Sequence, residues 1–437
     1  MSTPDAPRRA AFDVLRAVDA DGAYSNLVLP ATLRSRGITG RDAAFATELV
    51  AGTLRGRGTY DAILDSLVSR SPDAAVRDAL RLGTHQILAM RTPAHAAVAT
   101  TVELVRAAIG HGPAGFVNAV LRRVAADDLD GWVRRLAPDP VTDPTGHAAF
   151  AYSHPRWVVD ALRDAVGADE LDALLVADNL PPKVTLVALP GLADPAELGG
   201  TPSTRSPYAV TLEGGDPGDL AAVAEGRARV QDEGSQIVTI AFAEAAVDGR
   251  DERWLDMCAG PGGKTALLAA LAASRGARVL ASERLPHRAG LVRGAVPAVR
   301  DGMSGVVVAD GTVPPWPAET FDRVLVDAPC SGLGALRRRP ESRWRRTPED
   351  VAALVRLQRA LVDAAIDTTR PGGVVGYVTC TPVLAETAGV VGAVLAGRDD
   401  VVLDPVEAGT GPLPGTVQLW PHRDGTDAMF LALLRRR

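Results

Sequence analysis

Five short apolar runs, separated by segments of helix length, constrain the fold of this 437-residue chain more than any other feature. They follow Gln236 and span residues 254–257, 278–282, 305–309, 324–327 and 373–378. Short apolar runs that alternate with helical segments are typical of βαβ units. Residues 238–437 are therefore predicted to form a doubly wound, Rossmann-like α/β domain, with a ligand at the carboxyl ends of the strands.

The first part of the chain has a different pattern. Over residues 7–126 apolar side chains recur at helical spacing, for example at 10–18 and 76–90, and strand-like runs are missing. We therefore expect an all-α domain over residues 1–140.

The stretch between these two parts is rich in residues that break helices. Three prolines, a glycine and several Asp and Thr residues at 137–154 predict a linker. One helix over 158–175 and β-rich pieces at 184–189 and 209–212 then predict a small α+β subdomain. Linker and subdomain together are assigned to residues 141–237.

Composition limits where the protein acts and what it binds. No run of about 18 apolar residues lacks charge or proline, and no apolar core follows the basic N-terminus, so we expect a cytoplasmic protein with no membrane partner. Its three cysteines, Cys258, Cys330 and Cys380, are too few and too scattered for a disulfide framework or a zinc site. We expect free thiols, no metal and a monomer.

The formal net charge of -6 argues against the whole molecule binding a polyanion, so any RNA contact needs a local basic patch. One candidate patch has six arginines against Glu341 alone: Arg337, Arg338, Arg339, Arg343, Arg345 and Arg346. An RNA surface and a solvated loop both stay open for it, and Trp344 could stack on a base or anchor the loop. Arg122 and Arg123 could contact RNA phosphates, although exposed helical arginines more often contact only water.

A glycine-rich turn follows the first predicted strand, and its residues are Cys258, Ala259, Gly260, Pro261, Gly262, Gly263 and Lys264. Glycines permit close backbone approach, and the next helix N-terminus offers free N–H groups to a ligand. Glu283, at the end of the second strand, is placed to bind ribose hydroxyls. Asp310, after the third strand, could hold an adenine amino group. These residues predict a nucleoside cofactor.

Other interpretations of these residues remain open. A phosphate-binding loop is disfavoured because the glycine spacing is wrong for it, whereas a purely structural turn is still possible. Asp310 precedes Gly311, and an Asp–Gly pair is an ordinary turn former.

The fourth and fifth predicted strands are each followed by a cysteine. Asp327 and Cys330 lie at the end of the fourth strand, and Cys380 follows the fifth. Adjacent strand ends face one crevice, so both thiols should converge beside the cofactor. A thiolate can add reversibly to carbon 6 of cytosine, which makes carbon 5 nucleophilic, and Asp327 could stabilise the charged intermediate. Taken singly, each cysteine is more often a small buried hydrophobe.

These motifs resemble those of the RNA cytosine-5 methyltransferases of the NOL1/NOP2/Sun family. The resemblance covers 231–236, the glycine-rich turn, 327–334 and 379–380, in the family's order. It implies S-adenosylmethionine as methyl donor, Cys380 as nucleophile and Cys330 as the residue that assists release. Cytosine-5 enzymes that act on DNA use their Pro-Cys cysteine as nucleophile, so the presence of both favours RNA.

One departure from the family concerns the residues after the nucleophile. Many relatives have Ser after the nucleophilic cysteine and a Glu-Asn-Glu nearby. Here Thr381 follows Cys380, and only Glu386 remains.

Residues 41–46 and 115–122 resemble the NusB antitermination-factor domain. Such a domain fused to this catalytic core is the arrangement of RsmB-like 16S ribosomal RNA methyltransferases, and 152–155 and 419–422 also fit. The resemblance implies methylation of carbon 5 of one cytosine in 16S rRNA or in an early small-subunit assembly intermediate. The alternatives are an RNA-binding scaffold with an inactive methyltransferase domain, another RNA substrate such as tRNA, and a DNA cytosine-5 enzyme.

Overall fold

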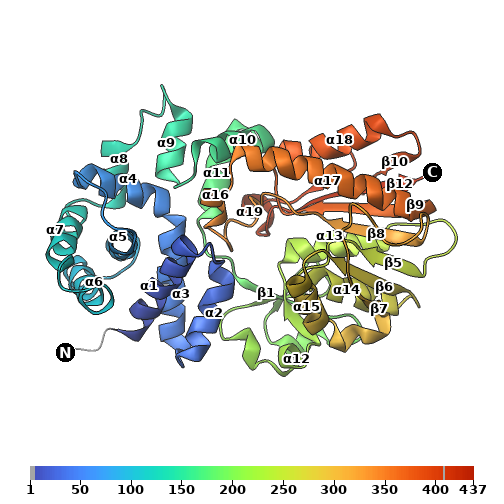
Figure 1. The fold of residues 1–437 in the computed structure, drawn as a ribbon, viewed down its shortest axis with the longest axis horizontal. Helices are drawn as coiled ribbons and strands as arrows, with labels where there is room; N and C mark the ends of the chain where they lie inside the picture. The colour runs from blue at the N-terminus through green and yellow to red at the C-terminus, as the bar shows by residue number, and fades with distance from the viewer. Residues whose placement is uncertain (1–4, 407–408) are drawn as a thin grey trace. The chain divides into compact units, whose positions relative to one another are not determined.

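The computed structural model describes residues 5–406 and 409–437, and the chain divides into two compact units. The helical unit contains the chain up to Pro181 together with the segment Leu336–Arg345. The sheet unit contains Pro182–Ala335 and Arg346–Arg437 (Figure 1). The chain therefore leaves the sheet unit after Ala335, contributes ten residues to the helical unit, and then returns.

The helical unit has one main hydrophobic core, to which Leu49, Leu80 and Leu121 contribute fully buried side chains. The described residues before Pro181 form no strand, which confirms the all-α prediction. Its helices are α1 (Ala6–Ala20), α2 (Ser25–Ser35), α3 (Gly40–Arg55), α4 (Arg57–Leu67), α5 (Ala74–Leu88), α6 (Ala94–Ala108), α7 (Ala114–Val124), α8 (Leu129–Leu136), α9 (Pro144–Ala151), α10 (Arg156–Val166), α11 (Ala168–Asp178) and, from the inserted segment, α16 (Ser342–Arg345).

Two local predictions in this unit need correction. The single helix predicted over 158–175 is two helices, because Gly167 between α10 and α11 has φ +89°, a conformation that L side chains rarely adopt. The segment predicted as a linker contains α9, whose first residue is Pro144. Proline is tolerated there because the first helical N–H has no partner within the helix, and the Asp143 side chain caps the helix by accepting from Gly146 N–H.

The first sheet of the sheet unit is small and antiparallel, with strand order β2-β3-β1-β4. It contains the β-rich pieces predicted at 184–189 and 209–212, whereas α10 and α11, which replace the helix predicted for the same subdomain, belong to the helical unit. Its elements are β1 (Val184–Ala188), η1 (Pro195–Leu198), β2 (Thr201–Pro202), β3 (Ala209–Leu212), η2 (Pro217–Asp219), α12 (Ala221–Ala224) and β4 (Ala228–Val230).

The second sheet has the order β10-β12-β9-β8-β5-β6-β7, with β11 paired to β12. All five predicted strands are present, as the parallel strands β5 to β9. Strands β10, β11 and β12 were not predicted, and they pair antiparallel. The elements are α13 (Glu233–Glu244), β5 (Arg253–Asp256), α14 (Gly263–Ala273), β6 (Arg278–Glu283), α15 (Pro286–Ala295), η3 (Pro297–Gly302), β7 (Met303–Val308), β8 (Phe321–Asp327), α17 (Pro348–Thr368), β9 (Thr369–Thr379), η4 (Leu384–Glu386), α18 (Ala388–Gly397), β10 (Val401–Asp404), β11 (Val417–Gln418), α19 (Pro421–Asp424) and β12 (Phe430–Arg436).

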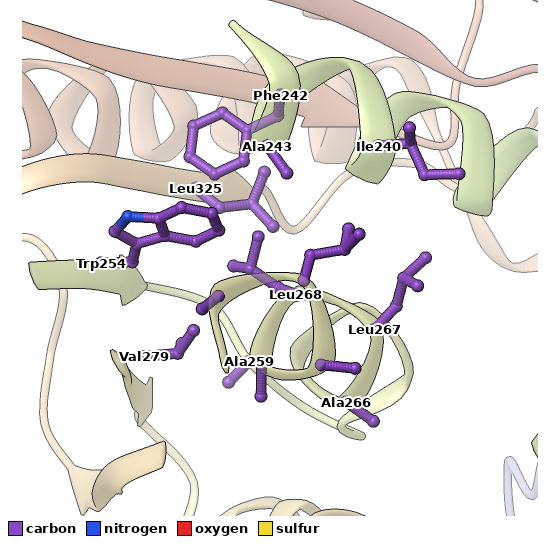
Figure 2. Close-up of a cluster of buried hydrophobic side chains, with 14 of the residues drawn as sticks. Ile240, Phe242, Ala243, Trp254, Ala259, Ala266, Leu267, Leu268, Val279 and Leu325 are labelled. Carbon is purple, nitrogen blue, oxygen red and sulfur yellow. The ribbon is translucent and has the colours of Figure 1, made fainter. Parts of the chain in front are cut away.

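Alternating side chains of this sheet enter two different cores, as the period of two in a strand requires. Trp254 faces the core shared with α13 and α14, where Figure 2 shows Phe242 and Leu268 beside it. Leu255, the next residue, belongs to the core shared with α17 and α18 on the opposite face. Both faces are thus covered by helices. The order reverses at β5, which lies between β6 and β8, and this reversal leaves the carboxyl ends of the central strands available to a ligand.

Candidate active site

Four neighbouring strands deliver the predicted site residues to one edge of the sheet. Strands β9, β8, β5 and β6 are adjacent in that order and parallel. Cys380 follows β9, Asp327 ends β8, the glycine-rich turn follows β5, and Glu283 ends β6. The parallel arrangement brings these ends together because all four strands point the same way.

The glycine-rich turn depends on two glycines. A Cβ on Gly260 would lie 2.3 Å from Glu283 Oε2, and one on Gly262 would lie 2.6 Å from the Ala295 Cβ, at a backbone φ of +107°. The turn is held by Glu283, which accepts from Gly260 N–H at 3.1 Å, and by Arg288, which donates to Gly260 O at 2.6 Å. Larger residues at these two glycines would displace the turn.

Glu283 and Asp310 differ in their surroundings. Glu283 is buried, and its second oxygen accepts from Leu285 N–H at 2.9 Å. Asp310 is exposed and accepts from the Thr312 N–H and hydroxyl, as in an ordinary turn. Those two hydrogen bonds hold the pKa of Asp310 below its usual value. The geometry ties Glu283 to the glycine-rich turn and Asp310 to its own loop.

Lys264 connects the turn to the end of β8. Its ammonium lies 2.9 Å from Asp327 Oδ2 and is largely buried. Burial opposes the charge, but Asp327 and, to a smaller extent, the Cys380 sulfur favour it, so the pKa of Lys264 is raised overall. A cation is therefore maintained beside Cys380.

Asp256, the last residue of β5, was not singled out from the sequence. It is buried and accepts from the Thr265 hydroxyl at 2.7 Å. Burial raises its pKa to about 7 against the countering Thr265 hydrogen bond, with a smaller upward contribution from the Asp327 charge. Its position at the end of β5, two residues before the glycine-rich turn, was the signal that could have identified it.

The two predicted catalytic thiols lie in contact. Cys330 Sγ is 3.3 Å from Cys380 Sγ, and both side chains are partly exposed. The contact with Cys380, then burial, then the charges of Cys380 and Glu386 raise the pKa of Cys330 well above its usual value. The contact with Cys380 therefore helps to keep the Cys330 thiol protonated.

The surroundings of two further residues, Cys258 and Glu386, differ from what the sequence suggested. Burial raises the pKa of Cys258, the third cysteine, so this thiol is held protonated in the glycine-rich turn. Glu386, which the sequence marked only as what remains of a family motif, is fully buried and contacts Ser331, next to Cys330. No local sequence pattern indicates that contact, because 55 residues separate the partners.

The arginine patch contains side chains of every degree of burial. Most of it belongs to the inserted segment of the helical unit, and only Arg339 of its six arginines is exposed. Arg343 is completely buried, donates to Ser153 O at 3.0 Å and Asn179 Oδ1 at 2.9 Å, and its pKa is lowered by burial to about 10.

The inserted segment has further anchors in the same unit. Trp344 packs so tightly on Gly58 that a Cβ there would lie 2.4 Å from its ring. Arg345 donates to the carbonyls of Val18 and Ala23. Of the two proposed roles for Trp344, the structure supports the anchoring of a loop. Arg123 likewise donates to Leu67 O, at 2.6 Å.

Comparison with known proteins identifies both halves of the chain. The family model described as 16S rRNA methyltransferase RsmB/F matches residues 246–435, a range that includes all the strand-end residues above. The model of the NusB family matches residues 5–126. A probable ribosomal RNA small subunit methyltransferase B of Bacillus subtilis is 30% identical, over 98% of both chains. The chain belongs to the 16S rRNA methyltransferase RsmB/F family.

Other relatives of this RsmB/F-family methyltransferase agree. A putative methyltransferase of Mycobacterium tuberculosis is 55% identical, over 99% of this chain and 97% of its own. The crystal structure of PH0851 has the same fold over 100% of both chains, with a TM-score of 0.84 at 22% identity. Within the described residues, the RsmB/F-family chain has no helix long and apolar enough to cross a membrane and no His, Cys, Asp and Glu cluster that could hold a metal ion.

Proposed function

We propose that this RsmB/F-family methyltransferase transfers a methyl group from S-adenosylmethionine to carbon 5 of a cytosine in 16S ribosomal RNA. The observation that carries the proposal is the pair of thiols 3.3 Å apart at the ends of two adjacent parallel strands. Transfer to an exocyclic amine needs no such pair. The names of relatives such as the Bacillus subtilis protein favour small-subunit rRNA as the substrate.

The residues of the turn fit S-adenosylmethionine. Gly260 and Gly262 let the turn pack closely against Glu283 and Ala295, whereas a Cβ at Gly263 would meet no atom within 4 Å. The first N–H groups of α14 belong to this turn, and Glu283 is a buried acceptor one strand away. We assign Cys258 to Lys264, Glu283, Asp310 and Asp327 to the cofactor site. When bound, S-adenosylmethionine supplies a methyl carbon that is electrophilic because it is attached to a sulfonium.

Cys380 is the nucleophile in this mechanism. Its thiolate forms a bond to carbon 6, which moves the carbon 5–carbon 6 π electrons into the ring and makes carbon 5 nucleophilic enough to take the methyl group. The Lys264 ammonium stabilises that thiolate, and Asp327 orients Lys264. We place Asp327 near N3 and the amino group of the base, where its carboxyl group can accept from the amino group and share the proton at N3 that compensates the negative charge brought by the thiolate.

Cys330 completes the cycle when, after releasing its own proton to water, its thiolate accepts the carbon 5 proton. The carbon 5–hydrogen pair then reforms the carbon 5–carbon 6 double bond, and the bond from Cys380 to carbon 6 breaks, which returns the Cys380 thiolate. The contact between the two sulfur atoms supports this division, because both must reach the same ring. Each bond formed in this cycle is matched by a bond broken, and no oxidant or reductant is needed.

The remaining assignments belong to the same proposal. Residues 1–140 form a NusB-like RNA-binding domain, 141–237 a small RNA-recognition subdomain after a linker, and 238–437 the catalytic domain. We propose that the protein acts in the cytoplasm as a monomer, on free rRNA or on an early assembly intermediate.

Transfer of a labelled methyl group to unmodified 16S rRNA tests the proposal. Wild type should form 5-methylcytosine, Cys380→Ala should form none, and Cys330→Ala should accumulate a covalent protein–RNA adduct. Activity that survives in Cys380→Ala but not in Cys330→Ala would instead indicate the mechanism of the DNA enzymes. RNA binding without any methyl transfer by the wild type would indicate an inactive scaffold.

A further inference from the structure

Glu386 lies in η4, a short turn after β9, and no part of its side chain is exposed. Its Oε1 accepts from Ser331 N–H at 2.8 Å, and its Oε2 accepts from the Ser331 hydroxyl at 2.5 Å. Ser331 directly follows Cys330. The carboxylate therefore holds both polar groups of the residue beside one of the two thiols.

A second set of contacts fixes the other side of Cys330. The Gln358 amide, from α17, donates to Glu386 Oε1 at 3.0 Å and to Pro329 O at 2.9 Å. Pro329 and Ser331 flank Cys330, so one buried carboxylate and its amide partner hold the residues on both sides. The Tyr377 hydroxyl in turn donates to Glu386 O at 2.6 Å, which fixes η4 to β9.

A carboxylate is costly to bury, and its hydrogen bonds must offset that cost. Among the described residues no cation forms an ion pair with Glu386, and three donor groups face its two oxygens instead. A neutral amide could keep its oxygen toward Ser331 N–H and Gln358 and turn its NH2 group toward the Ser331 hydroxyl, because a hydroxyl can also accept. The change Glu386→Gln therefore removes the charge and reverses one hydrogen bond, whereas the native carboxylate keeps a negative charge close to Cys330.

We infer that Glu386 is a positioning residue of the catalytic site, which holds Cys330 against Cys380 and keeps Cys330 protonated until Cys380 has bonded to the base. Only the second part of this inference, the protonation of Cys330 until Cys380 has bonded to the base, rests on the proposed function. The positioning of Cys330 follows from the contacts of the protein itself.

The charges around Cys330 support this order of events. The groups that face it are Cys380 at the end of β9, Tyr377 within β9, and Glu386. The contact with Cys380 is the largest cause of the raised pKa of Cys330, followed by burial, and the charges of Cys380 and Glu386 act in the same direction. Bond formation between Cys380 and carbon 6 removes the largest of these causes. Cys330 can then release its proton to water and accept the carbon 5 proton.

The helical unit provides a matched control. Glu341 is also buried and accepts from a serine in the same way, from Ser25 N–H at 3.0 Å and from the Ser25 hydroxyl at 2.9 Å. Its exposed fraction is 1%, against 0% for Glu386. The change Glu341→Gln therefore reports the general cost of neutralising a serine-bound buried carboxylate.

The first readout is the reactivity of the Cys330 thiol in full-length Cys380→Ala protein, with and without Glu386→Gln or Glu341→Gln. Iodoacetamide alkylation of Cys330 is followed against pH by peptide-resolved mass spectrometry. Glu386→Gln should move the alkylation midpoint to lower pH by about one unit, or tenfold in thiolate fraction. Glu341→Gln should leave the midpoint unchanged. An unchanged midpoint in Glu386→Gln would overturn the inference.

The second readout is methyl transfer to 16S rRNA in proteins that retain both cysteines. Glu386→Gln should reduce the rate about 30-fold, and Glu341→Gln less than about threefold. Ser331→Ala, which removes only the hydroxyl donor, should give an intermediate loss even if Glu386→Gln folds poorly. Equal losses in Glu386→Gln and Glu341→Gln would show a purely structural role and overturn the inference. If the wild type methylates no cytosine, the proposed function fails, while the alkylation experiment still decides the positioning role.

Discussion

Glu341 and Glu386 bind a serine through the same two contacts, but they stabilise different kinds of structure. In the helical unit Glu341 fixes an inserted segment whose other anchors are buried or packed side chains such as Arg343 and Trp344. In the sheet unit Glu386 fixes a turn that carries a thiol 3.3 Å from a second thiol. A buried carboxylate therefore indicates function only through the groups that it holds in place.

The largest expected effect is in the helical unit. Arg343→Met removes every hydrogen bond that the buried guanidinium donates to Ser153 O and Asn179 Oδ1 and leaves these acceptors unpaired. We expect the free energy of unfolding to fall by about 3 kcal/mol, measured by urea denaturation. If the variant is as stable as the wild type, the inserted segment is not an anchor and the contrast between the two glutamate sites fails.

The next largest effect is expected at the catalytic site of the sheet unit. The chain offers a control for it, because it has two lysines. Lys264→Met removes the cation beside Cys380, whereas Lys183→Met removes only an exposed pair with Glu213. We expect Lys264→Met to slow methyl transfer about 100-fold, equivalent to about 2.7 kcal/mol, with Lys183→Met near wild type. Parallel rates of Cys380 alkylation should follow the same order. Equal rates in the two variants would remove Lys264 from the mechanism.

The raised pKa of Asp256 predicts that the stability of the protein depends on pH. Burial raises the pKa of Asp256 from 3.8 to about 7, so between about pH 4 and pH 7 the folded protein binds a proton that the unfolded chain has lost. This contribution to stability is fully present below about pH 4 and is lost as the pH rises to about 7. Relative to Asp256→Asn, we expect the wild type to lose unfolding free energy across that window, by up to about 1.4 kcal/mol for each pH unit. Urea titrations at several pH values measure the difference, and a constant difference would contradict the shifted pKa.

The smallest effect compares one glycine from each unit. Gly167→Ala forces a side chain into a backbone φ of +89° with no neighbouring atom within 4 Å, so about 1 kcal/mol of stability should be lost and nothing else. Gly262→Ala adds a clash with Ala295, and it should also weaken S-adenosylmethionine binding, about tenfold by calorimetry. Unchanged cofactor affinity in Gly262→Ala would show that the turn does not shape the cofactor site.

The sequence identified most of the elements that carry this comparison, but not their contacts. All five parallel strands and the glycine-rich turn were predicted, because a strand buried on both faces and a turn with positive φ each leave a local pattern. The helix break at Gly167 was missed because a single glycine within a helical pattern is often tolerated. The run of β12 is apolar enough to have been recognised, but its pairing with β9 and β10 joins distant segments.

The order of the domains, the strand ends and the two cysteines follow from periodicity and residue type, so they could be predicted without a structure. The assignment of the arginine-rich segment to the helical unit, and the burial of Arg343 there, became known from the folded chain. So did the contact through which Glu386 holds Ser331. The contacts of Glu386 with Ser331 and of Arg343 with Ser153 each join residues more than 50 positions apart. Their free energy comes from burial and hydrogen-bond geometry, which no local pattern encodes.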